Sequence, residues 1–98
     1  MNDLKELIKE AINKSTEASD AFYQQKIADG NKAINETVNI ISSCIDRISE
    51  EVKEFDVNTF LNNISEALKA LESKDYVLLA DILSYDVKEQ LEAVYNSL

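Results

Sequence analysis

The chain has 98 residues and a formal net charge of −9, with one glycine, one cysteine and no histidine, proline or tryptophan. The missing histidine excludes Ser-His-Asp and Cys-His catalysis and imidazole metal ligands, and a single cysteine cannot form an intrachain disulfide or a thiolate zinc site. Because 19 acidic residues outnumber 10 basic ones, we expect no nucleic-acid or membrane partner, and we predict no catalytic residue, cofactor or metal.

The first predicted helix begins near Leu4, and along residues 4–22 apolar and small residues recur at steps of three and four. This stripe consists of Leu4, Leu7, Ile8, Ala11, Ser15, Ala18 and Phe22. The scarcity of glycine and proline favours helices over all-β folds, which need many tight turns. Asn2 or Asp3 is placed to cap this helix, and Glu10 and Lys14 are spaced as an i,i+4 ion pair on its polar side.

A turn is predicted after this helix. The stripe loses phase beyond Phe22, and Asp29-Gly30-Asn31 is a strong turn signal. Glycine adopts the left-handed conformation that ends many helices, so Gly30 is expected in that position. The first helix should therefore end between Tyr23 and Asp29, and Asn31 should cap the second.

The second helix has the most regular apolar pattern in the chain, with alternating steps of four and three residues. Its members are Ile34, Val38, Ile41, Ile45, Ile48, Val52 and Phe55. A 3.5-residue repeat is typical of the seam of a coiled coil or a helical bundle, so the stripe predicts either the core of this chain or a dimer contact. Cys44, at the edge of the seam, is interpreted as a small buried hydrophobe.

The third segment should begin at Asp56, whose carboxylate is placed to cap a helix. With Asp56 as the cap, Phe55 and Phe60 have the spacing of a hydrophobic staple, and Asn58 is the competing cap. The apolar stripe then continues to Leu71.

Asp75 is placed to cap a fourth helix that runs to about residue 97. The fold class predicted is all-α: an antiparallel up-down bundle of four helices, forming one domain over residues 1–98. Ser73-Lys74-Asp75 contains neither glycine nor proline, so three helices, with the last two segments fused, is the alternative.

The fourth helix carries more apolar surface than one packing face needs. Leu78, Ile82 and Tyr85 form a second, narrower stripe outside its main apolar face. A surplus stripe of this kind indicates either a docking surface for a partner or a helix buried on both sides within the monomer.

The acidic stretch around the end of the second helix is the other candidate for partner binding. Asp46, Glu50 and Glu54, with Glu51 and Asp56, lie where the helix dipole disfavours negative charge. They form either a surface for a basic partner or a solvated face that keeps the protein soluble. Asp81 and Asp86 flank the last apolar face but diverge by about 140° on a helix, so they should not share a site.

The C-terminal run from Ala67 to Asp86 contains the sequence DYVLLADILSYD. This run resembles small uncharacterised all-helical proteins of Clostridia and related Firmicutes, in which "DYVLLADILxY(D/E)" opens the last helix. An earlier helix of those proteins has a glycine followed by a regular Ile/Leu seam, as Gly30 to Val52 does here. The resemblance covers about two-thirds of the chain and implies a helical fold without implying an activity.

Two better-known classes are similar to the chain in outline. Flagellar and type III export chaperones are small, acidic, helical and cytosolic, and they bind amphipathic helices of their cargo. Secreted WXG100-type hairpins are about as long, and Tyr85-Asp86-Val87-Lys88-Glu89 fits the spacing of their C-terminal signal, but Trp is absent and Gly30 lies too early for their turn.

The function predicted is a non-enzymatic protein–protein interaction module, an adaptor or export-chaperone-like protein that binds an unknown protein partner, with a homodimer as a candidate assembly. The lone thiol and the absence of an export pattern favour a cytoplasmic location. The alternatives are a structural subunit of a larger assembly, a WXG100-like secreted protein and an enzyme based on carboxylates.

Overall fold

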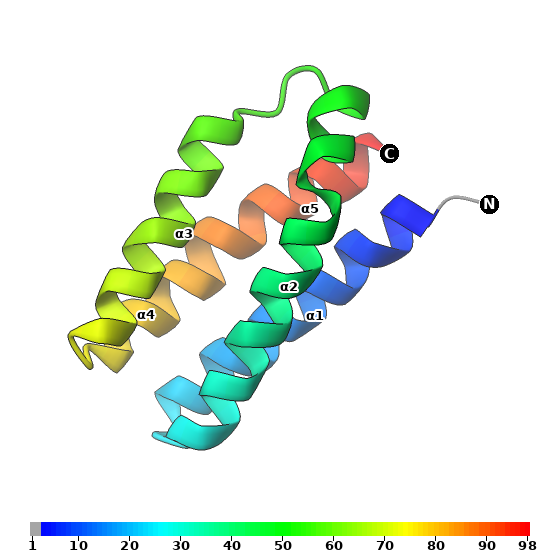
Figure 1. Cartoon of the computed structure of the whole chain (residues 1–98). Helices are drawn as coiled ribbons and strands as arrows, with labels where there is room; N and C mark the ends of the chain where they lie inside the picture. The colour runs from blue at the N-terminus through cyan, green and yellow to red at the C-terminus, as the bar shows by residue number, and fades with distance from the viewer. Residues whose placement is uncertain (1–2) are drawn as a thin grey trace.

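Four helical segments follow one another in antiparallel succession, as predicted. The computed structural model describes residues 3–98, so the candidate cap Asn2 lies outside the described residues. The first three segments are α1 (Asp3–Tyr23), α2 (Ile27–Glu51) and α3 (Val57–Glu72). The last is one long helix composed of α4 (Tyr76–Asp81), a π-helical stretch η1 (Ile82–Val87) and α5 (Lys88–Ser97) (Figure 1). Residues 3–98 contain no strand, so the all-α four-helix prediction is confirmed.

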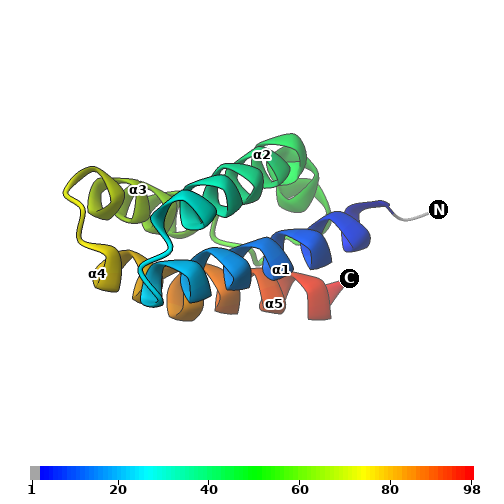
Figure 2. The ribbon, with the colours of Figure 1, turned by 90° about the horizontal axis from the view of Figure 1, so that it is seen from below.

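The helices form two layers, with α2 and α3 above α1 and the last helix (Figure 2). α1 packs closely on α2 and along the whole last helix, whereas α3 packs closely on α4 and η1. α2 and α3 share a layer but are not a closely packed pair. α2 and α3 therefore pack mainly on the helices of the lower layer. The surface between α2 and α3 in the upper layer has no close helix–helix packing.

The core lies between the two layers and includes most of the predicted seam of α2. Ile34, Ile41, Ile48 and Val52 are buried, whereas Val38, Ile45 and Phe55 pack against the core with part of their surface exposed. Most of the seam is thus core within one chain, and Val38 and Ile45 lie at its partly exposed edge. Cys44 is also buried, and burial raises the pKa of its thiol.

Two turns end in residues with left-handed backbone conformations, and neither residue is glycine. Gln25 and Lys74 both have φ of 60°. After α1, the Gln25 and Lys26 amides donate to the Phe22 and Ala21 carbonyls at 3.1 and 2.8 Å. After α3, the Lys74 and Asp75 amides donate to the Leu71 and Ala70 carbonyls at 3.1 and 2.9 Å, which is the same Schellman pattern.

Replacing Gln25 or Lys74 with glycine should stabilise the protein. A left-handed L-residue costs roughly 1–2 kcal/mol, and the greater freedom of glycine in the unfolded chain offsets about 0.5–1 kcal/mol of this. Each variant should therefore raise the free energy of unfolding by about 0.5–1 kcal/mol in urea titrations. Gln24→Gly, one residue earlier, is the control and should bring no gain.

The prediction for Gly30 is wrong. α2 begins at Ile27, four residues before the predicted cap Asn31, and Gly30 is a buried helical residue without a positive φ. A Cβ at this position would lie 2.6 Å from Cε1 of Phe22. Gly30 therefore permits the close approach of α2 to the end of α1, and Gln25 makes the turn.

The predicted starts of α3 and α4 are confirmed. Asp56 caps α3 by accepting from the Thr59 amide at 3.1 Å, and the Phe55 and Phe60 rings lie 5.4 Å apart as a staple. Asp75 caps α4 by accepting from the Leu78 amide at 3.2 Å. The chain reverses between α3 and α4, so the fused-helix alternative does not hold.

Candidate functional site

The predicted stripe on the last helix is only partly exposed. Tyr85 is 63% exposed and Leu78 is also exposed, but Ile82 is buried at 8%. Ile82 begins η1, whose wider turns rotate the chain less per residue than an α-helix does, so Tyr85 does not return to the side of Ile82. Ile82 therefore belongs to the core, which corrects its assignment to a docking stripe.

Two residues that the sequence did not single out extend the exposed surface. Val77 precedes Leu78 on α4, and Tyr23 is the last residue of α1; both are exposed. We call Tyr23, Val77, Leu78 and Tyr85 the tyrosine patch. The sequence predicts Tyr23 only as one limit of the range in which the first helix ends. No local pattern shows which residue of the last helix its side chain reaches.

Hydrogen bonds hold the Tyr23 side chain beside the last helix. Its hydroxyl donates to the Asp81 carboxylate and lies 3.3 Å from Oγ of Ser84. Asp81 thus pairs with Tyr23 across two helices, instead of with the i,i+4 neighbour Tyr85. Asp86 is exposed, and the hydrogen bonds of the Tyr23 hydroxyl are made to Asp81 and Ser84 and not to Asp86.

A buried serine connects α1 to the π-helical stretch. Ser15 is fully buried, and its Oγ donates to the Leu83 carbonyl at 3.0 Å. The Lys88 amide donates to the same carbonyl. π-Bulges are frequent at functional sites. Here α1 holds the Leu83 carbonyl of the π-helical stretch, and Tyr85 of the same stretch points outward. Periodicity predicted Ser15 on the apolar face but gave no sign of this bond.

A cavity of about 360 Å³ adjoins the tyrosine patch where the two helix turns meet. Phe22, Ile27 and Tyr76 line it with Tyr23 and Val77 of the patch, and Gln25, Lys74 and Asp75 complete it. The rings of Phe22 and Tyr76 are stacked with centroids 5.7 Å apart and planes 3° apart. Its apolar lining and aromatic stack make the cavity suited to one large apolar side chain.

The acidic cluster lies apart from this surface. Asp46, Glu50 and Glu54 are exposed near the C-terminal end of α2, whereas the tyrosine patch adjoins the turn before its N-terminus. The 25-residue helix separates them by roughly 35 Å at 1.5 Å per residue. Arg47 pairs with Glu51 at 4.0 Å and Lys53 follows, so basic residues interrupt the acidic run.

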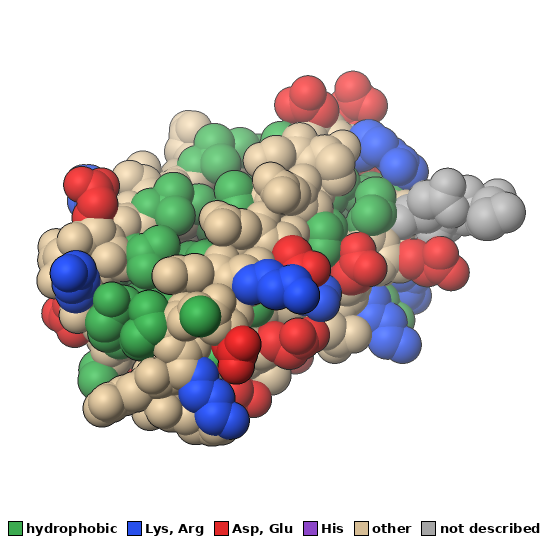
Figure 3. All heavy atoms as spheres, turned by 60° about the horizontal axis from the view of Figure 1, so that its bottom comes forward, with side chains coloured by type: hydrophobic (Ala, Val, Ile, Leu, Met, Phe, Trp, Pro, Cys, Tyr) green, Lys and Arg blue, Asp and Glu red, His purple; other side chains and the backbone are tan. Residues whose placement is uncertain are grey.

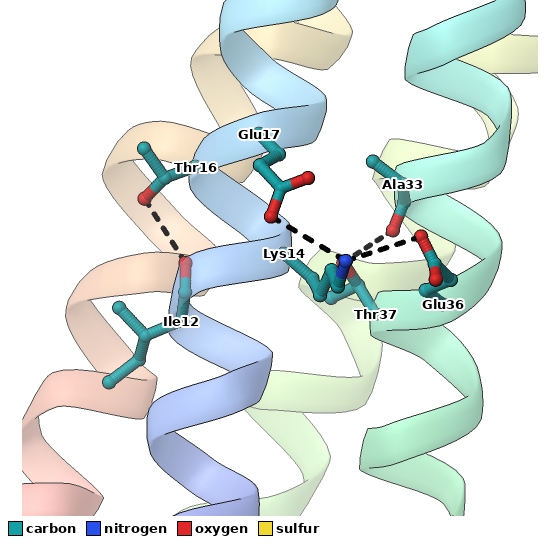
Figure 4. Close-up of polar contacts among 7 residues, drawn as sticks. All are labelled: Ile12, Lys14, Thr16, Glu17, Ala33, Glu36 and Thr37. Atoms are coloured by element: carbon teal, nitrogen blue, oxygen red, sulfur yellow. Dashed lines mark hydrogen bonds and ion pairs between the residues drawn. The ribbon is translucent and has the colours of Figure 1, made fainter.

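A second cavity, of about 430 Å³, lies between α1 and α2 and is lined mainly by charged residues. Nζ of Lys14 lies 3.6 Å from carboxylate oxygens of both Glu17 and Glu36, so the predicted Glu10–Lys14 pair is replaced by a bridge between helices (Figure 4). These two carboxylates raise the pKa of Lys14. The residues that the structure describes include no cluster of three or more metal-ligating side chains.

The hydrogen bond to Asp81 raises the pKa of Tyr23 above its ordinary value of 10.0. Because ionisation removes the donated proton, the bond should stabilise the fold below pH 10 and cease to do so as pH rises through the raised pKa. Spectrophotometric titration, with Tyr23→Phe to identify the signal, should show late ionisation in the wild type and ordinary ionisation in Asp81→Ala. Identical titration of the wild type and Asp81→Ala would contradict the assigned bond.

Comparison with known proteins gives one match. A family model described as "Domain of unknown function (DUF8042)" matches residues 1–97. Neither a curated protein nor a solved structure matches the chain. Within residues 3–98, no helix combines the length and the apolar character needed to cross a lipid bilayer.

Proposed function

Since the chain belongs to the DUF8042 family, a family of domains of unknown function that brings no activity with it, we propose its function from its surface. The protein is a non-enzymatic interaction module, and the tyrosine patch docks an amphipathic helix of a partner protein. The observation that carries the proposal is the gathering of exposed large hydrophobic residues around the Tyr23–Asp81 bond.

The distribution of exposed apolar surface supports this site. Six large hydrophobic side chains are exposed in the described chain, and Tyr23, Val77, Leu78 and Tyr85 are four of them. Patches of exposed large apolar residues mark interaction sites, and tyrosine is enriched among the residues that dominate binding energy. The Asp81 bond holds the Tyr23 ring in place, so less side-chain freedom is lost when a partner binds.

The dimensions suit a helix. Leu78 and Tyr85 are seven residues apart, which corresponds to about 10 Å along the helix axis. Two turns of an amphipathic helix, with apolar anchors at i, i+3 or i+4 and i+7, match that length. The cavity of about 360 Å³ beside Val77 accepts one further anchor at the end of the patch.

The proposal includes an adaptor or export-chaperone-like role in the cytoplasm, and membership of the clostridial group whose motif the last helix resembles. An enzyme based on carboxylates is less well supported, because Asp81 is engaged by Tyr23 and Asp86 is exposed. Neither residue lines any of the five cavities described for residues 3–98.

Affinity capture from the native host, with matched variants as bait, tests the proposal. The wild type and Leu61→Asp/Leu68→Asp, which alters exposed residues of α3, should recover the same partner, whereas Leu78→Asp/Tyr85→Asp should lose it. Circular dichroism must first show that both variants remain helical. Equal recovery by all three baits, or loss only with the α3 variant, would place binding elsewhere and overturn the proposal.

A further inference from the structure

A second apolar surface lies on the upper layer, away from the tyrosine patch. Leu61 and Leu68 of α3 are 46% and 40% exposed and one heptad apart, and Ile64 and Leu71 between and beyond them are half-buried. Because α2 and α3 are not closely packed, the side of α3 that carries Leu61 and Leu68 has no packing neighbour in the upper layer. The core alone does not explain why leucine occupies both exposed positions.

The facing flank of α2 has a matching stripe. Asn31, Asn35, Val38, Ser42 and Ile45 follow one another at steps of three and four. On α3 the equivalent stripe is Asn58, Leu61, Ser65 and Leu68. With α3 to the left of an upward-running α2 and the core behind both (Figure 1), right-handed helices place the two stripes on neighbouring flanks of the outer surface. We call this surface the α2–α3 face.

The α2–α3 face is free of charge along both stripes, although 30% of the chain is charged. Figure 3 shows hydrophobic and uncharged polar side chains over the upper middle part of the molecule, while charged side chains stand at its left edge and gather in its lower and right parts. Depletion of charged residues is one compositional signal of an interface core.

We propose that the α2–α3 face binds a second copy of this chain to form a homodimer. Two copies that each carry a net charge of −9 repel one another, and this neutral face is where their approach costs least. A basic amphipathic helix would find no carboxylate within either stripe to pair with, so charge complementarity favours a second copy over a basic partner.

The dimensions and symmetry of the molecule define the dimer contact. The molecule measures 37 × 25 × 19 Å along its principal axes, so the roughly 800 Å² per partner of a standard interface would take nearly all of its broad side, and the contact must extend beyond the two stripes. A two-fold axis brings the leucines of α3 in each copy against the stripe of α2 in the other, which makes a self-complementary contact. This inference is independent of the partner proposed for the tyrosine patch.

Sedimentation equilibrium of the full chain tests the dimer. The wild type should have twice the chain mass of 11.1 kDa at high micromolar concentration. Leu61→Glu/Leu68→Glu should raise the dissociation constant by about a hundredfold or more, because charges without partners are costly to bury. Asn35→Glu/Ser42→Glu should do the same without removing an apolar residue, which covers the case in which the leucine variant fails to fold.

Val77→Glu/Leu78→Glu is the matched control, since it adds the same charge at two exposed apolar positions of the tyrosine patch. It should remain dimeric, and raising the salt concentration should tighten the wild-type dimer by screening its repulsion. A monomeric wild type, a dimer that survives in folded Leu61→Glu/Leu68→Glu, or dissociation of the control would each overturn the proposal. Retained partner capture by a monomeric α3 variant would leave the tyrosine patch proposal intact.

Discussion

Gly30→Ala should lower the free energy of unfolding by about 2 kcal/mol, although the same change within an exposed helix stabilises by about 1 kcal/mol. The added Cβ would lie 2.6, 2.7 and 2.8 Å from three atoms of the Phe22 ring. That ring is 1% exposed and stacked on Tyr76, so it cannot move without disturbing a second aromatic residue. Urea titration of both proteins measures the difference.

A double-mutant cycle identifies Phe22 as the cause. In the Phe22→Leu background the planar ring is gone, so Gly30→Ala should cost much less than it does in the wild type. If Gly30→Ala stabilises the wild type, or costs the same in both backgrounds, the close approach of α2 to Phe22 is not what the glycine serves.

Phe60→Ala should destabilise the protein by about 3–5 kcal/mol, because it empties a fully buried aromatic position. Small domains have a total stability of about 5–15 kcal/mol, so this variant should be close to unfolding at room temperature. Thermal and urea denaturation followed by circular dichroism measure the effect.

Phe55→Ala provides the comparison within the same staple. Phe55 is half-buried and contacts the Phe60 ring from outside the helix, so its loss should cost about 1 kcal/mol. Equal costs for the two variants would show that Phe60 gains its stability from the staple alone and not from its place in the core.

Periodicity predicted the helices because each buries one stripe against the same core. The seam of α2, the Asp56 and Asp75 caps and the Phe55–Phe60 staple are all local patterns, in which the residues that interact lie within a few positions of one another. Such features depend little on how the helices are arranged.

The predicted turn at Gly30 is wrong because glycine can serve either of two purposes: it can adopt a left-handed conformation, or it can leave space for a neighbouring side chain. Gln25 and Lys74 accept left-handed conformations that glycine adopts more easily, while Gly30 provides space for Phe22. Only the packing of α1 against α2 decides between these uses. The π-helical stretch could not be predicted either, since its Leu83 carbonyl bonds to Ser15, 68 residues away in sequence.

The candidate site was predicted in part for the same reason. An α-helical wheel predicts Leu78, Ile82 and Tyr85 on one surplus stripe, but Ile82 is buried because η1 turns less per residue than the wheel assumes. Tyr23 belongs to the site because its hydroxyl bonds to Asp81, and this bond joins α1 to the last helix. Asp46, Glu50 and Glu54 proved to lie at the other end of α2.

We expect a partner helix to dock on the tyrosine patch. Calorimetric titration of the captured partner's helical segment into the purified chain measures this binding. We expect one segment to bind per chain, the affinity to fall at least tenfold with Tyr85→Asp, and the affinity to stay unchanged with Leu61→Asp/Leu68→Asp. Undiminished binding to folded Tyr85→Asp would contradict this expectation.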